Sequence, residues 1–586
     1  MDFFEQQELR RRNSRRLVAW FLLAAAFTVA SYCAAGGLGY ALLSKYSTGT
    51  AEVPWRLLAA LAALVGGCIL AVSAYRLWQL RAGGHVVAEL LGARYIDPGK
   101  CNPTERRLLN VVEEMAIASG VSVPPLYVLL HEPAVNGLVA GHSPNEAVLI
   151  MTRGAMEKLS RDELQGVVGH EFSHILNGDM VLNLRLAGLL AGLTWLGEQG
   201  EKMVYAAAGQ ARGVPREKQG AGAVLALIGL LIAFIGFPGT LAATAIKAAI
   251  SRQREFLADA ASVQFTRNPE GIAGALDSIL ALPAHTVVLA AHAEGLSHMF
   301  FAPAVAHWWG FPTHPPIGER IYRAHPRFQR DDYRATRHGR LREVAVIDGG
   351  GNVVKHVRAN ALEVLASIGQ PTARHVDFGA RLLDRLPERL RAALHNPREA
   401  ELAMFALGGF GDRSGDLGPP VSALAREHML TLADLAVPAI KSQLQKARDA
   451  FLAEFAALVE SDRRVTLREF VLLTFLRQRL REGAGQAIGT RYRKVAEVEE
   501  DLRVVLALLA RASGERAGGE APAAGALSAA LERLRHLAPF EKPRVLKACL
   551  EAVQADGKIG LAEGELVRMV AATLDCPVPP LLSEAL

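Results

Sequence analysis

The sequence has few cysteines and little excess of charge of either sign. Its 586 residues include five cysteines, and Lys and Arg together exceed Asp and Glu by six. Because the cysteines are scattered and odd in number, they argue against a disulfide framework and fit a reducing compartment. Basic and acidic residues are interspersed along most of the chain, so no basic patch predicts nucleic-acid binding.

Two familiar motifs are also missing. The first apolar segment, residues 17–43, is too long for a signal peptide, and no clean cleavage motif follows it. The glycine-rich run at residues 348–352 is not followed by the Lys-Ser or Lys-Thr of a phosphate-binding loop. We therefore predict that the first segment is a membrane helix and that the glycine run is a hairpin turn.

Long apolar segments are the dominant positive feature. Apolar residues make up 51% of the chain, and its mean hydropathy is positive. A membrane-spanning helix needs about 20 apolar residues. Four segments are candidates: residues 17–43, 57–75, 181–196 and 224–246. The third is the weakest because it is short and contains Arg185, so a buried or interfacial helix is its alternative.

The charge flanking these segments predicts their orientation. An arginine cluster at residues 10–16 precedes the first segment, and the positive-inside rule keeps such a cluster in the cytoplasm. Four crossings then place both termini inside and leave short external loops. The chain after residue 330 is soluble in composition and helical in pattern, and is therefore predicted to be cytoplasmic.

The pentapeptide His170-Glu171-Phe172-Ser173-His174 matches the pattern H-E-x-x-H. Ser160 and Glu163 predict a capping-box start for a helix that carries it. Histidines four residues apart share one helical face and can bind a single zinc ion, while the glutamate between them can act as a base on water. The alternative is two histidines on a helix surface without a metal.

A catalytic zinc usually has three protein ligands. Glu255 is the candidate for the third, and Asp259, one helical turn later, can orient a histidine from behind. The alternative is a solvated acidic face. His170 and Glu255 must lie on the same side of the membrane, which requires an even number of crossings between them. The hydropathy pattern places two there.

Three stretches resemble the HtpX and CAAX-prenyl-endopeptidase family of integral-membrane zinc metalloproteases. They are ELQGVVGHEFSHILNGDM, SRQREFLADAAS and THPPIGERI, in the family's order and spacing within residues 90–325. The resemblance implies a zincin-like domain with Zn²⁺ held by His170, His174 and Glu255, and Glu171 as the catalytic base. It also implies an active site facing the cytoplasm of a bacterial inner membrane and, for the HtpX branch, a role in membrane-protein quality control.

The resemblance extends to two residues of the third stretch. His314 and Arg320 match positions thought to stabilise the negatively charged oxygen of the tetrahedral intermediate, and a fixed cationic donor suits that role. The alternative is that His314 lies in a turn and Arg320 is a surface charge on a helix.

Three short β-rich segments are predicted before the H-E-x-x-H helix, at residues 125–131, 135–140 and 146–152. The middle one carries Asn136-Gly137-Leu138 where the family commonly has Asn-Ala-Phe. If this strand pairs with extended substrate, recognition of the peptide backbone survives and the side-chain preference is altered.

The C-terminal half repeats itself. Asp462 and Asp556 each have an aliphatic residue three positions later and a glutamate seven positions later, a pattern similar to helical domains of the tellurite-resistance TerB type. It is not an EF-hand loop, because the acids are not at alternate positions. The alternative to metal binding is an aspartate that caps a helix.

These features predict an α+β membrane protein that is mostly helical, with about four transmembrane helices and a small β-sheet. The predicted parts are a membrane hairpin (1–84), a zinc metalloprotease domain interrupted by two membrane helices (85–330), a connecting region (331–420) and a helical TerB-like module (421–586). The predicted function is hydrolysis of membrane or misfolded polypeptides. The rivals are a sequence-specific prenyl-type processing protease and a membrane scaffold with a vestigial zinc site.

Overall fold

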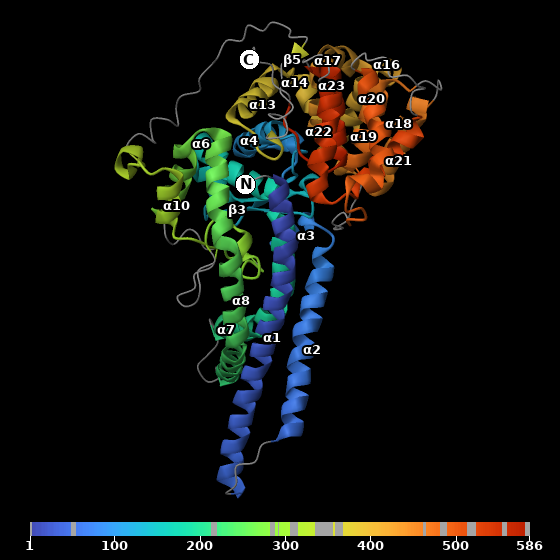
Figure 1. Cartoon of the computed structure of the whole chain (residues 1–586). Coiled ribbons are helices and arrows are strands. Elements are labelled where there is room, and N and C mark those ends of the chain that lie inside the picture. The colour runs from blue at the N-terminus through green and yellow to red at the C-terminus, as the bar shows by residue number, and fades with distance from the viewer. Residues whose placement is uncertain are drawn as a thin grey trace.

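The computed structural model describes residues 3–48, 54–211, 220–281, 288–290, 292–304, 314–334, 356–357, 367–460, 465–480, 489–512, 523–553 and 559–580. The predicted turn at 348–352 and both aspartates of the C-terminal repeat lie outside these residues. Four long helices project from one side of a globular half that contains the sheet and the remaining helices (Figure 1).

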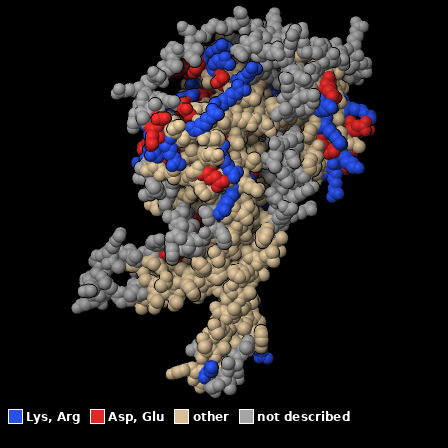
Figure 2. All heavy atoms as spheres, turned by 60° about the vertical axis from the view of Figure 1, so that its left-hand side comes forward, with Lys and Arg blue, Asp and Glu red and all other residues tan. Residues whose placement is uncertain are grey.

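The long helices are α1 (Phe3–Thr48), α2 (Trp55–Leu80), α7 (Asp179–Ala211) and α8 (Gly220–Thr266). Each contains a segment long and apolar enough to cross a membrane, which confirms the four predicted spans. Figure 2 shows the charged side chains gathered on the globular half, whereas the described surface of the projecting helices is almost free of them except at the far tip.

Helix α7 explains why the third span was the weakest in the sequence. Its Leu186, Leu190 and Leu193 are buried in a cluster with residues of α1, α2 and α8. A helix packed against other helices presents less surface to lipid, so its hydropathy can be lower. The prediction of a membrane helix holds, and the charged Arg185 lies exposed near its start.

A small mixed sheet lies beside the globular end of these helices. It has the order β1 (Arg94–Tyr95), β2 (Leu126–Leu129), β4 (Val148–Thr152) and β3 (Gly137–Ala140), so β3 is an edge strand. Strands β2 and β4 are parallel, and β3 runs antiparallel to β4. The three predicted strands are confirmed with shorter ends, and the two-residue β1 was not predicted.

Helix α6 (Arg161–Asn177) carries the H-E-x-x-H motif and packs against α4 (Pro103–Ser119) and β3. Its predicted capping box is present, because the Ser160 hydroxyl accepts a bond from the Glu163 amide and the Glu163 carboxylate accepts one from the Ser160 amide. Gly178 ends the helix in a left-handed conformation. Among the described residues before 330, the remaining α-helices are α3 (Gly84–Leu90), α5 (Arg153–Lys158), α9 (Pro269–Leu280) and α10 (Ile317–Ala324).

The C-terminal half is helical, as predicted. Its helices are α13 (Ala373–Arg385), α14 (Glu388–His395), α15 (Pro397–Gly408), α16 (Gly411–Ser414), α17 (Gly418–Lys441), α18 (Gln445–Glu460), α19 (Leu467–Leu480), α20 (Glu499–Ala512), α21 (Ala524–Arg535), α22 (Lys542–Val553) and α23 (Leu561–Thr573). Strand β5 (His356–Val357) of the connecting region pairs with β6 (Ile559–Gly560), so this region contributes to the C-terminal module.

The C-terminal module packs directly on α4. One hydrophobic core runs from α4 and the sheet into the C-terminal helices. Buried Glu113 of α4 accepts hydrogen bonds from Arg391 and His395 of α14, and Lys441 donates to the carbonyl of Asn145 at 2.6 Å. Helix α4 therefore lies between α6, which carries the H-E-x-x-H motif, and the module.

The end of α4 offers a test of this docking. Gly120 has φ +66°, and a Cβ atom there would lie 2.0 Å from the carbonyl oxygen of Val578. Gly92 has nearly the same φ, +68°, with nothing within 4 Å of its position for a Cβ. Both alanine substitutions incur the strain of a left-handed residue, about 1–3 kcal/mol. Only Gly120→Ala also displaces the C-terminal segment.

We expect Gly120→Ala to lower the thermal midpoint of the detergent-solubilised protein clearly more than Gly92→Ala does. It should also speed proteolytic release of the C-terminal half. Equal midpoints and equal proteolysis for the two variants would show that the contact between α4 and Val578 does not stabilise the protein.

Candidate metal centre

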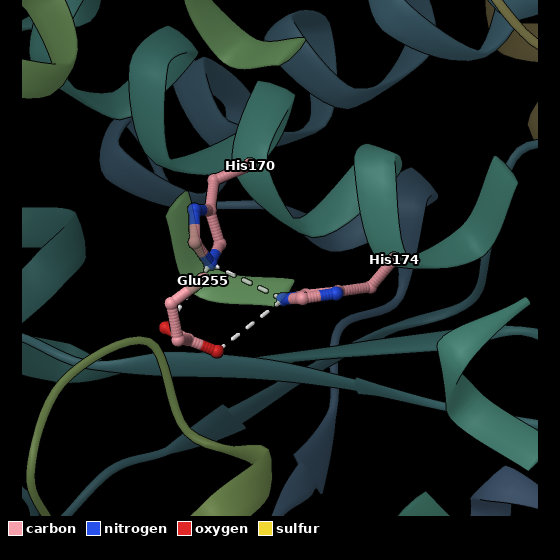
Figure 3. A group of neighbouring side chains, drawn as sticks. All are labelled: His170, His174 and Glu255. Carbon is pink, nitrogen blue, oxygen red and sulfur yellow. Dashed lines mark hydrogen bonds and ion pairs between the residues drawn. The ribbon is translucent and has the colours of Figure 1, made fainter. Parts of the chain in front are cut away.

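Three predicted ligand residues meet where α6 and α8 cross. Their ligand atoms all lie within 4.8 Å of one another. The Nε2 atoms of His170 and His174 are 3.2 Å apart, and each lies 3.8 Å from a carboxylate oxygen of Glu255. Figure 3 shows the two imidazoles of α6 and the carboxylate of α8 pointing toward one another. The antiparallel membrane segments of α7 and α8 bring Glu255 back to α6, as the even-crossing argument requires.

The chemistry of this donor set fits a metal ion. The Nδ1 atoms of His170 and His174 lie 2.9 Å from carboxylate oxygens of Asp259 and Asp179. Because a carboxylate accepts hydrogen bonds, each Nδ1 carries the proton and each Nε2 keeps its lone pair. Two imidazole lone pairs and one carboxylate thus converge on one point, as in three-ligand catalytic zinc sites. The predicted orienting role of Asp259 agrees with this geometry.

Glu171 lies beside these ligands without a side-chain hydrogen bond. It is fully buried, and the Val139 backbone on β3 is its hydrogen-bonding neighbour. Burial raises the pKa of Glu171 to about 8. A buried carboxyl group with few partners costs free energy, and such groups occur where water or substrate supplies the missing bonds. This environment suits a group that exchanges protons.

Arg320 is fully buried, so its alternative as a surface charge is wrong. Its guanidinium donates two hydrogen bonds to Asp259, at 2.8 and 2.7 Å, and one to the carbonyl of Phe301 at 2.6 Å. It also lies 3.3 Å from a carboxylate oxygen of Glu255. Three of its donors are therefore engaged, two of them with Asp259, the residue behind His170. Its role toward an oxyanion stays a prediction.

His314 is buried as well, and its ring lies between two acceptors. Its Nδ1 atom is 3.3 Å from Glu255, and its Nε2 atom is 3.2 Å from the carbonyl oxygen of Ser297. It therefore touches a predicted metal ligand directly, and it is not simply a turn residue. Its catalytic role also stays a prediction.

The predicted substrate strand, β3, is the outer strand of the sheet and lies beside α6. Part of that edge is already paired, because the Phe301 amide donates to the Gly137 carbonyl at 2.8 Å. The Asn136 side chain donates to the carbonyl of Ala302 and accepts from its amide, both at 3.1 Å. The third predicted substrate-strand residue, Leu138, is fully buried. Substrate binding by this strand stays a prediction.

Sequence reasoning missed two residues of the centre. Asp179 holds His174, and Arg254 lies 3.4 Å from Asp179. Both were visible within the resembling stretches, because Asp179 directly follows the glycine that ends the active-site helix and Arg254 directly precedes Glu255. The sequence did not indicate that these two residues lie close together in space, because α6 and α8 are distant along the chain.

Comparison with known proteins agrees with this geometry. The sequence model of peptidase family M48 matches residues 102–327. Protease HtpX homologs from Streptococcus pneumoniae strains Hungary19A-6 and P1031 are each 33% identical over 267 residues, which cover 44% of this chain and 86% of the relative. No solved structure matches the chain. The TerB-like resemblance of the C-terminal half stays a prediction. With a peptidase region, apolar membrane helices and a His-His-Glu cluster in one chain, this protein belongs to peptidase family M48 as an HtpX-like membrane protease.

Proposed function

We propose that the chain is a zinc-dependent endopeptidase that hydrolyses membrane or misfolded polypeptides in membrane-protein quality control. The convergence of His170, His174 and Glu255 on one point carries the proposal. The rival with a vestigial site is disfavoured because the ligands, a candidate base and the aspartates behind the histidines are all present. The rival processing protease shares the same chemistry and differs only in substrate.

The chain's own residues supply proton transfer and positioning. A zinc ion held by the three ligands would polarise the scissile carbonyl and lower the pKa of a water molecule to about 7. Glu171 would accept the proton of the attacking water and deliver it to the leaving amine nitrogen. His314 and Arg320 lie against Glu255, and donors there would stabilise the negative charge that develops on the former carbonyl oxygen.

An extended substrate has to open this centre before it can react. His170 and Glu171 are fully buried, and the Phe301 ring packs against the His170 ring with centroids 4.9 Å apart. The backbone amide of Phe301 also donates a hydrogen bond to the Gly137 carbonyl of edge strand β3. We propose that the substrate takes the place of residues 301–302 along this strand.

The metal itself provides the direct test. The purified protein should contain a single zinc ion per chain, and Glu255→Ala or His174→Ala should lower zinc content and affinity because each removes a ligand. The matched control is Glu157→Ala, which removes an exposed carboxylate on α5. Zinc content is measured by atomic spectroscopy. Unchanged zinc content and activity in Glu255→Ala would contradict this ligand set.

The orientation of the centre is a separate proposal. The arginine cluster before the first span favours a cytoplasmic N-terminus, and four crossings return the chain to that side. We expect reporter fusions at residue 330 to show a cytoplasmic location and fusions at residues 212–219 an external one. An external reading at residue 330 would overturn the cytoplasmic site.

A further inference from the structure

Each histidine of the metal centre contacts an aspartate through its Nδ1 atom, and each of these aspartates contacts an arginine. On one side Asp259 joins His170 to Arg320, with two hydrogen bonds between the carboxylate and the guanidinium. On the other side Asp179 joins His174 to Arg254. The two arms come from different elements, so the arrangement is not a repeat of one local motif.

The second arm is built differently from the first. Arg254 lies 3.4 Å from Asp179, donates to the Asn183 side chain at 2.6 Å and donates to the carbonyl of Ile250 at 3.2 Å. Asp179 and Asn183 lie one turn apart at the start of α7. Arg254 therefore links the first turn of α7 to α8 at the residue next to Glu255.

This placement fixes the position of the Asp179 side chain. The carboxylate lies at the N-terminal end of α7, with the Arg254 guanidinium 3.4 Å away. A carboxylate that accepts the Nδ1–H bond of a histidine fixes the orientation of the ring and leaves Nε2 to bind the metal. Both groups are largely buried, with 15% of the Arg254 side chain and 8% of the Asp179 side chain exposed, so solvent screens this interaction little.

We propose that Arg254 is a positioning residue of the metal centre, which acts through Asp179 to hold the ring of His174 in its ligating orientation. The proposal rests on the proposed function, because it assumes that His170, His174 and Glu255 bind a metal. In this proposal the Arg254 side chain contributes both to the packing of α7 on α8 and to the orientation of the His174 ring.

The test compares Arg254→Gln with Arg252→Gln in the full-length protein. Arg252 is an exposed arginine on the same helix, so it controls for loss of a positive charge near the centre. We expect Arg254→Gln to weaken zinc binding by about 10–100-fold, as loss of such supporting partners usually does. Binding is measured by competition with a chromophoric chelator. The absorption bands of the Co²⁺-substituted protein should also change, because they report the ligand geometry.

Two further variants separate positioning from a general loss of stability. Asp179→Asn keeps the size of the side chain and removes its charge, and it should reproduce the change in the Co²⁺ spectrum. Arg254→Lys keeps the charge and should restore part of the zinc affinity. Thermal unfolding of the metal-free proteins should give a lower midpoint for Arg254→Gln than for Arg252→Gln, because Arg254 also links α7 to α8, so zinc affinity and the Co²⁺ spectrum decide the positioning role.

The outcomes distinguish this inference from the proposed function. If the unmodified protein binds zinc, and Arg254→Gln matches Arg252→Gln in affinity and in Co²⁺ spectrum, the positioning role is overturned and the centre stands. A fall in thermal midpoint with unchanged affinity and spectrum would also overturn it, because Arg254 would then be purely structural. If the unmodified protein binds no zinc, the metal centre fails and this inference fails with it.

Discussion

Replacing Glu171 with glutamine should nearly abolish peptide hydrolysis and leave the metal bound. The carboxyl group is not one of the three converging ligands, so its loss leaves the ligand set intact. Glutamine has almost the same shape but cannot accept the proton of water at neutral pH. A general base is typically worth about 10²–10⁴-fold in rate, and the expected loss in kcat is of that size.

The measurement is kcat on an unfolded model substrate, together with zinc content. Asp162→Asn is the matched control, because it removes an exposed carboxylate from the first turn of the same helix and should leave both quantities unchanged. Robust cleavage by Glu171→Gln would rule out this residue as the base. A variant that binds but cannot cleave is also suited to trapping substrates in cells. Trapped membrane or misfolded proteins would support quality control, and one prenylated protein would support the processing rival.

Replacing Arg320 with alanine should cost stability, zinc and turnover together. Arg320 is fully buried, and its guanidinium balances the carboxylates of Asp259 and Glu255. Removing one partner of a buried ion pair leaves an uncompensated charge, which typically costs about 3–5 kcal/mol. Because Asp259 also orients His170, the damage should reach the metal centre.

This expectation differs from that of a pure oxyanion donor. Such a donor acts mainly in the transition state, so its loss would lower kcat by about 100–1,000-fold with zinc content and fold unchanged. Thermal midpoint, zinc content and kcat measured on Arg320→Ala separate the two roles. Arg323→Ala, one turn away on α10 and largely exposed, is the control. A normal midpoint and full zinc with a lowered kcat would restore the oxyanion role as the dominant one.

Several features of this protein follow from local sequence and were predicted correctly. The membrane spans are runs of apolar residues, and the capping box and strands depend on residues a few positions apart. The helix that carries His170 and His174 is specified in the same local way. The pairing of Glu255 with them was proposed from its motif and from the family resemblance, and the membrane topology supported it, since two crossings return the chain to the same side.

Other features depend on which distant elements pack together, and no local pattern encodes that choice. Arg320 looks like one residue of an exposed amphipathic helix, yet it is buried because α10 folds back onto α8 and meets Asp259. Arg254 reads as a basic flank of a membrane span, yet α7 places Asp179 and Asn183 beside it. The C-terminal helices have ordinary amphipathic patterns, and they dock on α4 through a shared core, the hydrogen bonds of Glu113 and the close approach of Val578 to Gly120. Helical periodicity specifies which face of a helix is buried, whereas the partner of that face is determined by the packing of the whole chain.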